Sequence, residues 1–170
     1  LPMSESKVVP HLTNLHWILE DERTLHALLT FVGNEGRSKD VIIEKIYELM
    51  EGRLARSTCE RYAGSLVTYH FLWQESKGSK ALELSSFSLK YLHGELSYPD
   101  YILTCMSKNI EWAEFLPDLY NIIIKNAPSP MNQIKDGLRE IGYSIEKKDD
   151  RYIGEILPIL DKANVISIQD

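Results

Sequence analysis

Apolar residues recur at intervals of three and four through most of the chain, a spacing that predicts amphipathic helices. The first helix is expected near Asp21, where an acidic residue suits the positive end of a helix dipole, and it should stop at Gly33 and Gly36. Its apolar face is Leu25, Leu28, Leu29 and Val32. A second helix follows Ser38 as its N-cap and ends at Gly52. Its buried face is expected to be Val41, Ile42, Ile46, Leu49 and Met50.

A third helix is expected from Ser57, because Ser57 and Glu60 have the spacing of a capping box. Its inward face, extending into a following strand, is predicted to be Cys59, Tyr62, Ala63, Leu66, Val67, His70 and Trp73. Two short apolar runs, 71–73 and 81–84, then flank residues 74–80, where Lys77-Gly78-Ser79 is typical of a hairpin turn. Ser85 and Ser86 open another helix, over 87–96.

The second half of the chain repeats helical patterns of the same kind. Tyr98-Pro99-Asp100 is expected to break the chain and to mark a domain boundary. Further helices are predicted over 101–106, over 131–141 before Gly142, and from Asp149 or Asp150 onward. Another helix follows the apolar pattern of residues 112–126, and Pro117 within this pattern favours a start near Leu116 and Pro117. Residues 165–168 are predicted to form a terminal strand. We therefore divide the chain into an N-terminal segment 1–20, a first unit 21–98, and a helical linker with a second unit 99–170. Within the N-terminal segment, residues 11–19 fit either a short helix or a strand.

The composition is that of a globular protein, since 44% of the 170 residues are hydrophobic. No apolar run approaches the roughly 18 residues of a membrane span, and no basic and apolar leader indicates secretion. The two cysteines, Cys59 and Cys105, lie far apart without metal-ligand spacing, which fits a reducing compartment. We expect a cytoplasmic protein with no cofactor and no membrane partner.

Positive charge is concentrated in residues 53–80 of a chain whose formal net charge is −6. Five Lys or Arg residues stand there against two acids, whereas segments 1–52, 81–120 and 121–170 are each net negative. Basic residues on a helix and a hairpin tip indicate a surface that meets phosphates. The acidic remainder argues against a protein whose whole surface binds nucleic acid, but not against one that binds it through a single face.

The two halves share an order of helix, turn, helix, turn, helix and β-rich end. In the first half this order is carried by residues 57–67, Phe71-Leu72-Trp73, the Lys77-Gly78 tip and Leu82-Glu83-Leu84-Ser85. In the second half it is carried by residues 126–130, Ile134, Leu138, Ile141-Gly142 and 157–168. Through these residues the chain resembles the winged helix-turn-helix superfamily, in two tandem copies, and is similar to the DNA-reading regions of modular restriction endonucleases. The resemblance implies a mainly α fold with small β wings.

The chain departs from that family in two places. Tyr69, His70 and Trp73 are bulky for the end of a recognition helix, and Asp170 falls where a second wing would begin. Either the second wing is absent or the chain is a piece of a longer protein, an interpretation that also fits the opening Leu1-Pro2-Met3.

For function, the resemblance implies binding of double-stranded DNA, with the third helix in the major groove. The residues that it brings to DNA are Arg53, Arg56, Ser57, Thr58, Arg61, Ser65, Lys77 and Lys80 in the first copy, and Lys147, Lys148 and Arg151 in the second. Arginine forks would bind guanine edges or phosphates, and lysines would contact the DNA backbone. A plainer interpretation stays open, in which Ser57 caps the helix and the basic residues are solvated surface charges.

We expect no catalytic or metal site in this chain. The five histidines are scattered, and His70 is expected in the core, as are Trp17, Trp73 and Trp112. Pro117-Asp118 with Glu146-Lys147-Lys148 matches a loose motif of restriction nucleases, but both parts fall on helix or loop and not on adjacent strands.

The expected function is therefore the DNA-reading module of a restriction-type or regulatory protein, acting as a homodimer or joined to a nuclease domain. The alternative is a winged-helix module that binds another protein and no nucleic acid.

Overall fold

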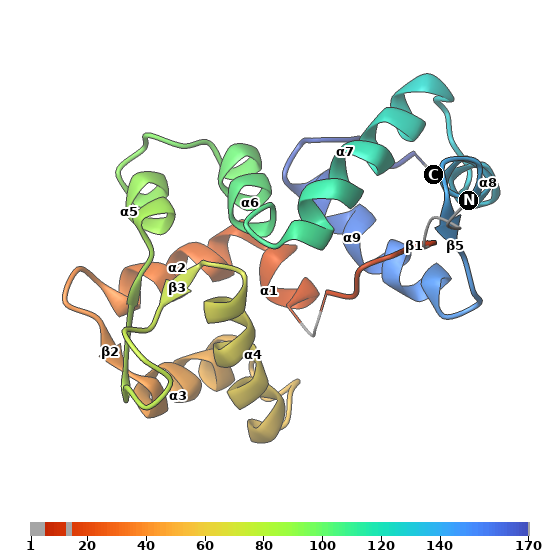
Figure 1. Cartoon of the computed structure of the whole chain (residues 1–170). Helices are drawn as coiled ribbons and strands as arrows, with labels where there is room; N and C mark the ends of the chain where they lie inside the picture. The colour runs from red at the N-terminus through yellow and green to blue at the C-terminus, as the bar shows by residue number, and fades with distance from the viewer. Residues whose placement is uncertain (1–5, 13–14, 170) are drawn as a thin grey trace.

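The computed structural model describes residues 6–12 and 15–169. In these residues the chain forms nine helices and five short strands, so the prediction of a mainly helical protein with little β structure is confirmed. Two groups of helices lie side by side, with α1 (His16–Leu19) between them (Figure 1). Residues 16–19 are thus helical, whereas Thr13 and Asn14 lie outside the described residues. None of the described helices is both long enough and apolar enough to cross a lipid bilayer.

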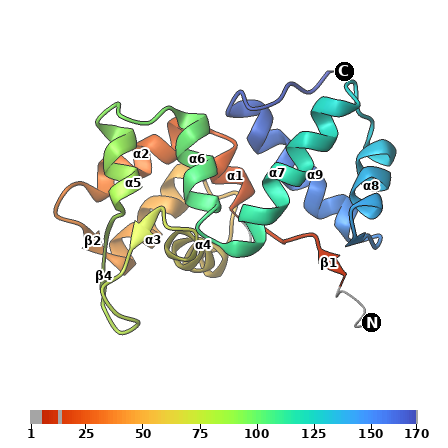
Figure 2. The same ribbon diagram turned by 45° about the horizontal axis from the view of Figure 1, so that its top comes forward.

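The first group of helices, which we call the first lobe, spans residues 22–106. Its helices are α2 (Glu22–Val32), α3 (Lys39–Leu49), α4 (Arg56–Thr68), α5 (Ser86–Leu92) and α6 (Tyr98–Met106). Its strands, β2 (Arg37–Ser38), β3 (Leu72–Trp73) and β4 (Ala81–Leu84), form an antiparallel sheet in the order β2-β4-β3. The hairpin between β3 and β4 projects from the lobe (Figure 2).

The core of this lobe follows the predicted apolar faces of α2 and α3 closely. All four predicted residues of α2 are buried, and the side chains of Asp21 and Ser38 cap the two helices by accepting hydrogen bonds from Arg23 N (3.1 Å) and Val41 N (3.4 Å). Val41 itself is exposed, and Ile43 is buried instead. Val41 was therefore wrongly assigned to the core, because it lies in the capped first turn and borders an open hollow beside the start of α4.

Helix α4 (Arg56–Thr68) begins two residues earlier than a cap at Ser57 would give. Its N-cap is Ala55, whose extended backbone precedes Arg56, and no side chain caps the helix. The prediction that Ser57 is the N-cap is wrong, because Ser57 already lies within the first turn. The end of the helix also differs, since His70 has a φ of 62° and an exposed side chain. Trp73 is 48% exposed and Trp17 40% exposed, so of the three tryptophans predicted to be in the core only Trp112 is buried.

Tyr98-Pro99-Asp100 begins helix α6 and does not break the chain. Proline is well tolerated in the first turn of a helix, where its missing N–H has no intrahelical partner. Ser97 caps this helix by accepting a hydrogen bond from Asp100 N (3.3 Å). Helix α6 then packs on α5, and Tyr98, Tyr101 and Cys105 are buried. The domain boundary near residue 98 stays a prediction.

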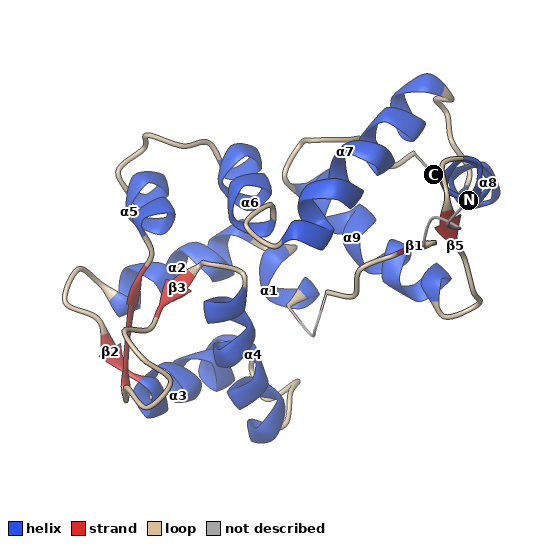
Figure 3. Ribbon diagram, viewed as in Figure 1, coloured by secondary structure: helices blue, strands red, loops and turns tan. Residues whose placement is uncertain are grey.

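The second lobe consists of α7 (Ile110–Lys125), α8 (Met131–Glu140) and α9 (Asp149–Lys162), together with β1 (Lys7–Val8) and β5 (Tyr143–Ser144). The two strands are parallel and bring the N-terminal segment to the second lobe, as the red arrows in Figure 3 show. Helix α7 continues through Pro117, so its predicted start near Leu116 is wrong. Pro117 is exposed, and water can therefore satisfy the carbonyl group that loses its intrahelical partner.

The C-terminal residues 165–168 form no strand in the described chain. They lack a partner strand, and Ile168 N instead donates a hydrogen bond to Asp161 Oδ1 (3.1 Å). The prediction of a terminal strand is therefore wrong. The strand β5 lies before α9, the last helix of the second lobe. Lys148 is the N-cap residue of α9, and Asp149 and Asp150 are the first two residues of the helix. Neither aspartate is therefore the N-cap.

Candidate nucleic-acid interface

Helix α4 has one face in the core and the opposite face in solvent. Cys59, Tyr62, Ala63 and Leu66 are buried, and α4 packs on α3. At about 100° of rotation per residue, Ser57, Arg61, Gly64 and Thr68 lie on the opposite side of the helix. We call these four residues the outward face of α4. A methyl group added at Gly64 would meet no atom within 4 Å, so the middle of this face is open.

Arg61 is the only cation on the outward face. Its side chain is exposed, and one guanidinium nitrogen donates a hydrogen bond to Thr58 Oγ1 (3.3 Å). No carboxylate of the described residues lies within ion-pair distance of it. Its charge is therefore available to an external anion. Ser57 is exposed one turn earlier, and Ser65 is half-buried at the edge of the face.

Arg56 lies on a different side of α4 from Arg61. Five residues of α-helix separate them by about 140° around the axis. The Arg56 guanidinium forms an ion pair with Glu44 of α3 and lies over the ring of Tyr47, 5.6 Å from its centroid. Arg56 and Glu44 line a hollow between α3 and α4 together with Asp40 and Glu60. Three carboxylates and a single guanidinium group thus line this hollow, and Glu44 is the carboxylate paired with Arg56.

Arg53 precedes α4 and faces away from its outward face. Its Nε donates to Met50 O (3.0 Å), and its guanidinium lies 6.0 Å from the ring centroid of Trp17. Arg53 lines a hollow of about 570 Å³ between the two lobes. The other residues that line this hollow are Trp17, Glu20, Asp21, Glu22, Arg23, Thr24 and Lys162. Arg53 therefore shares this hollow with three acidic residues and two other cations, and it contacts Met50 and Trp17.

The hairpin 74–80 carries the remaining two cations of the basic segment 53–80. The amide of Gln74 donates to Ser79 O (2.8 Å), and Lys39 N donates to Lys80 O (2.6 Å), so the hairpin is tied across its base and to the start of α3. The side chains of Lys77 and Lys80 are exposed. Trp73 stands exposed at the base of the hairpin, in register with Glu83 of β4.

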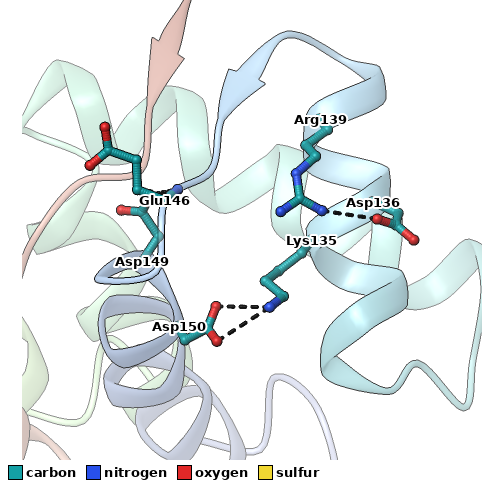
Figure 4. Close-up of polar contacts among 6 residues, drawn as sticks. All are labelled: Lys135, Asp136, Arg139, Glu146, Asp149 and Asp150. Atoms are coloured by element: carbon teal, nitrogen blue, oxygen red, sulfur yellow. Dashed lines mark hydrogen bonds and ion pairs between the residues drawn. The ribbon is translucent and has the colours of Figure 1, made fainter.

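The predicted second set of basic residues, Lys147, Lys148 and Arg151, has mostly acidic neighbours. Lys148 pairs with Glu146 (3.4 Å), and Arg151 pairs with Glu155 (3.3 Å). Figure 4 shows the surroundings, in which Lys135 of α8 reaches Asp150 (3.0 Å) and Arg139 reaches Asp136 (3.0 Å). Asp149 is buried and accepts a hydrogen bond from Glu146 N (2.7 Å), which fixes the turn before α9. Lys148 and Arg151 of the predicted set are therefore engaged in contacts within the protein.

The pKa shifts near α4 have structural causes. Burial raises the pKa of the Cys59 thiol, and the charge of Arg56 opposes that shift. Burial also raises the pKa of Tyr62 to about 12, with smaller contributions from Cys59, Glu155 and Glu20. Neither group is a reactive nucleophile at neutral pH, because a raised pKa keeps the thiol and the phenol protonated.

The residues of the nuclease-like pattern contact different partners. Asp118 accepts a hydrogen bond from Tyr143 OH (2.7 Å) and lies 3.6 Å from Lys7, whereas Glu146 pairs with Lys148 in the turn before α9. In the described part of the chain, no three His, Cys, Asp or Glu residues are grouped so that they could hold a metal ion. Comparison of the chain with family models, with curated proteins and with solved structures gives no match.

Sequence reasoning missed Glu44 and Tyr47, the partners of Arg56. Nothing in the sequence indicates this contact, because the residues belong to different helices and their pairing depends on how α3 crosses α4. The outward positions Gly64 and Thr68 could have been found, since they follow Ser57 and Arg61 by one heptad.

Proposed function

We propose that the first lobe is a winged-helix unit and that it binds double-stranded DNA through the outward face of α4 and the hairpin 74–80. The observation that carries this proposal is the position of Arg61, exposed on the side of α4 opposite the core and without a carboxylate partner among the described residues. The order α2, β2, α3, α4, β3, hairpin, β4 and the sheet order β2-β4-β3 support the assignment of the fold.

In this proposal α4 enters the major groove, which is wide enough to admit a helix. Arg61 supplies a planar fork for a guanine edge or a phosphate, and the hydroxyl groups of Ser57 and Thr68 contact the nearby backbone. Lys77 and Lys80 contact phosphates from the hairpin. Arg53, Arg56, Lys148 and Arg151 take a smaller part, because Arg53 bonds to Met50 and the other three are paired with carboxylates.

The second lobe enters the proposal as a related three-helix unit without a wing of its own. It supports the first lobe, and β1 ties the N-terminal segment to it. We further propose that the chain is the non-catalytic reading part of a cytoplasmic restriction-type or regulatory protein, acting as a homodimer or beside a nuclease domain. The two cysteines are free and buried, which is consistent with a reducing compartment.

The proposal is tested by fluorescence anisotropy with a labelled DNA duplex over a series of salt concentrations. Binding should weaken as salt rises, because contacts to phosphates release counterions. Arg61→Ala combined with Lys77→Ala should lower the affinity at least tenfold and reduce the salt slope by about two. Lys125→Ala, in the second lobe at the end of α7, is the matched control and should have little effect. An equal loss of DNA affinity in the double variant and in Lys125→Ala would show that α4 is not the interface.

A second candidate function is binding of another protein. It is favoured by an apolar groove of about 790 Å³ in the second lobe, between α7, α8, α9 and the residues after α9. Tyr120 and Ile124 are exposed at this groove. An absence of duplex binding at low salt, together with a loss of partner binding in Ile124→Glu, would favour this alternative.

A further inference from the structure

The contact of Arg56 with α3 is unusual for a residue at the start of a helix. The positive end of the helix dipole disfavours a cation there, and α4 has no acidic residue in its first turn. Glu44 supplies the missing negative charge from the neighbouring helix, and the face of Tyr47 supplies a second favourable contact. The side chains of Arg56 and Glu44 are 58% and 52% exposed, so an external ligand can reach both.

The charges around this pair are unfavourable for phosphate. Asp40 and Glu60 line the same hollow as Glu44 and Arg56, so three carboxylates and one guanidinium group share it. A phosphate that approaches the start of α4 must compete with Glu44 for the guanidinium fork and must come close to two further carboxylates. Glu44 holds one terminal nitrogen of the guanidinium group, so a phosphate that binds Arg56 through both terminal nitrogens must displace it.

We infer that Glu44 determines the affinity and selectivity of the interface by competing with phosphate for Arg56. This inference rests on the proposed binding of DNA. In the absence of DNA the Glu44 carboxylate holds Arg56 against α3, and only Arg61 and the hairpin lysines attract a duplex. A duplex that fits α4 closely enough brings a phosphate to Arg56 and displaces Glu44. A duplex that does not fit leaves the ion pair intact, so weak and non-specific binding is reduced.

The test is a double-mutant cycle with Glu44→Gln and Arg56→Ala, measured by anisotropy with a fluorescein-labelled duplex of random sequence. Glu44→Gln should raise the affinity about fivefold, the effect of one unit charge at about 4 Å in water. It should also steepen the salt slope by about one phosphate contact. When Arg56 is replaced by alanine, Glu44→Gln should raise the affinity only by the amount that the removal of one negative charge gives without a competing ion pair.

Glu48→Gln is the matched control, since Glu48 lies one turn further along α3 and pairs with its own cation, Lys45 (3.4 Å). The inference would be overturned if Glu44→Gln and Glu48→Gln changed the affinity equally, or if Glu44→Gln raised the affinity in full without Arg56. Binding of the duplex by the wild-type protein would still support the DNA role in that case. If neither the wild-type protein nor any variant binds the duplex at low salt, the proposed function fails and the role of Glu44 fails with it.

Discussion

The rings of Tyr91 and Tyr101 lie stacked, with their centroids 4.6 Å apart and their planes 3° from parallel. The hydroxyl group of Tyr101 lies 2.6 Å from Ser88 Oγ, which is also within hydrogen-bond distance of Phe71 O. The hydroxyl group of Tyr91 donates to Glu22 at the start of α2 (2.7 Å). These contacts join α5 and α6 to the sheet and to α2, so they hold the first lobe together behind the proposed interface.

Tyr101→Phe removes one buried hydroxyl group from this network and leaves Ser88 with one partner fewer. The loss should lower the free energy of unfolding by about 1 to 3 kcal/mol, because a buried polar group loses its hydrogen bond. Urea unfolding followed by circular dichroism measures the change. Tyr120→Phe, at an exposed position of α7, should change the stability by less than about 0.5 kcal/mol. A loss of similar size at both positions would contradict the role of the network.

Two helical glycines should respond to alanine in opposite directions. In Gly154→Ala the new methyl group meets nothing within 4 Å, so better helix propensity should stabilise the protein by up to about 1 kcal/mol. In Gly137→Ala the methyl group would lie 2.8 Å from Ile122 Cγ2, where α8 packs on α7. Overpacking there should cost about 1 to 3 kcal/mol. Thermal unfolding of the two variants compares them directly, and stabilisation by both substitutions would show that the α7–α8 contact is loose.

The protein should lose stability in alkali above pH 10. Burial raises the pKa of Tyr62 to about 12 and the pKa values of Tyr91, Tyr98 and Tyr143 further, against 10.0 for an exposed phenol. Below pH 10 these phenols are protonated in both the folded and the unfolded protein, so their contribution to stability is fully present. As the pH rises from 10 towards 12, the unfolded chain loses protons first, and the folded state is destabilised. Urea unfolding at pH 8, 10 and 11 tests this expectation, and an unchanged midpoint at pH 11 would contradict it.

Both thiols should be protected in the folded protein. Cys59 and Cys105 are buried, and burial raises the pKa of each thiol above its usual value of 9.0. Little thiolate is therefore present at pH 8, and a reagent cannot reach the sulfur atoms without local opening. Labelling with a chromogenic disulfide reagent should be slow in buffer and complete within minutes in denaturant. Rapid reaction of one thiol in buffer would identify a mobile helix around that cysteine.

Arg61→Lys tests whether Arg61 reads bases or only attracts phosphate in the proposed complex. Lysine keeps the positive charge but lacks the planar fork that binds a guanine edge with two hydrogen bonds. We expect the salt slope to stay unchanged while discrimination between duplex sequences falls about tenfold, as for the loss of one bidentate pair. Competition binding with a random-sequence library measures the discrimination. An unchanged sequence preference would restrict Arg61 to phosphate contact.

Much of the fold could be predicted from local pattern. The apolar spacing at Leu25, Leu28 and Leu29 predicted α2, and the cap at Ser38 predicted the start of α3, because burial of one helical face requires a repeat close to 3.6 residues. Predictions that depended on a single residue type fared worse. Pro99 lies in the first turn of a helix, where the missing N–H has no intrahelical partner, and Pro117 lies within a helix at an exposed position.

The sequence by itself determined most of the helical segments and that positive charge gathers in residues 53–80, because both properties depend on near neighbours in the chain. Only the tertiary structure decided how those charges are used. It pairs Arg56 with Glu44, turns Arg53 towards Trp17 and leaves Arg61 exposed, and it brings β1 beside β5 across the length of the chain. The physical reason is that an ion pair or a strand pairing depends on the crossing of distant elements, which the spacing of residues along one helix does not specify.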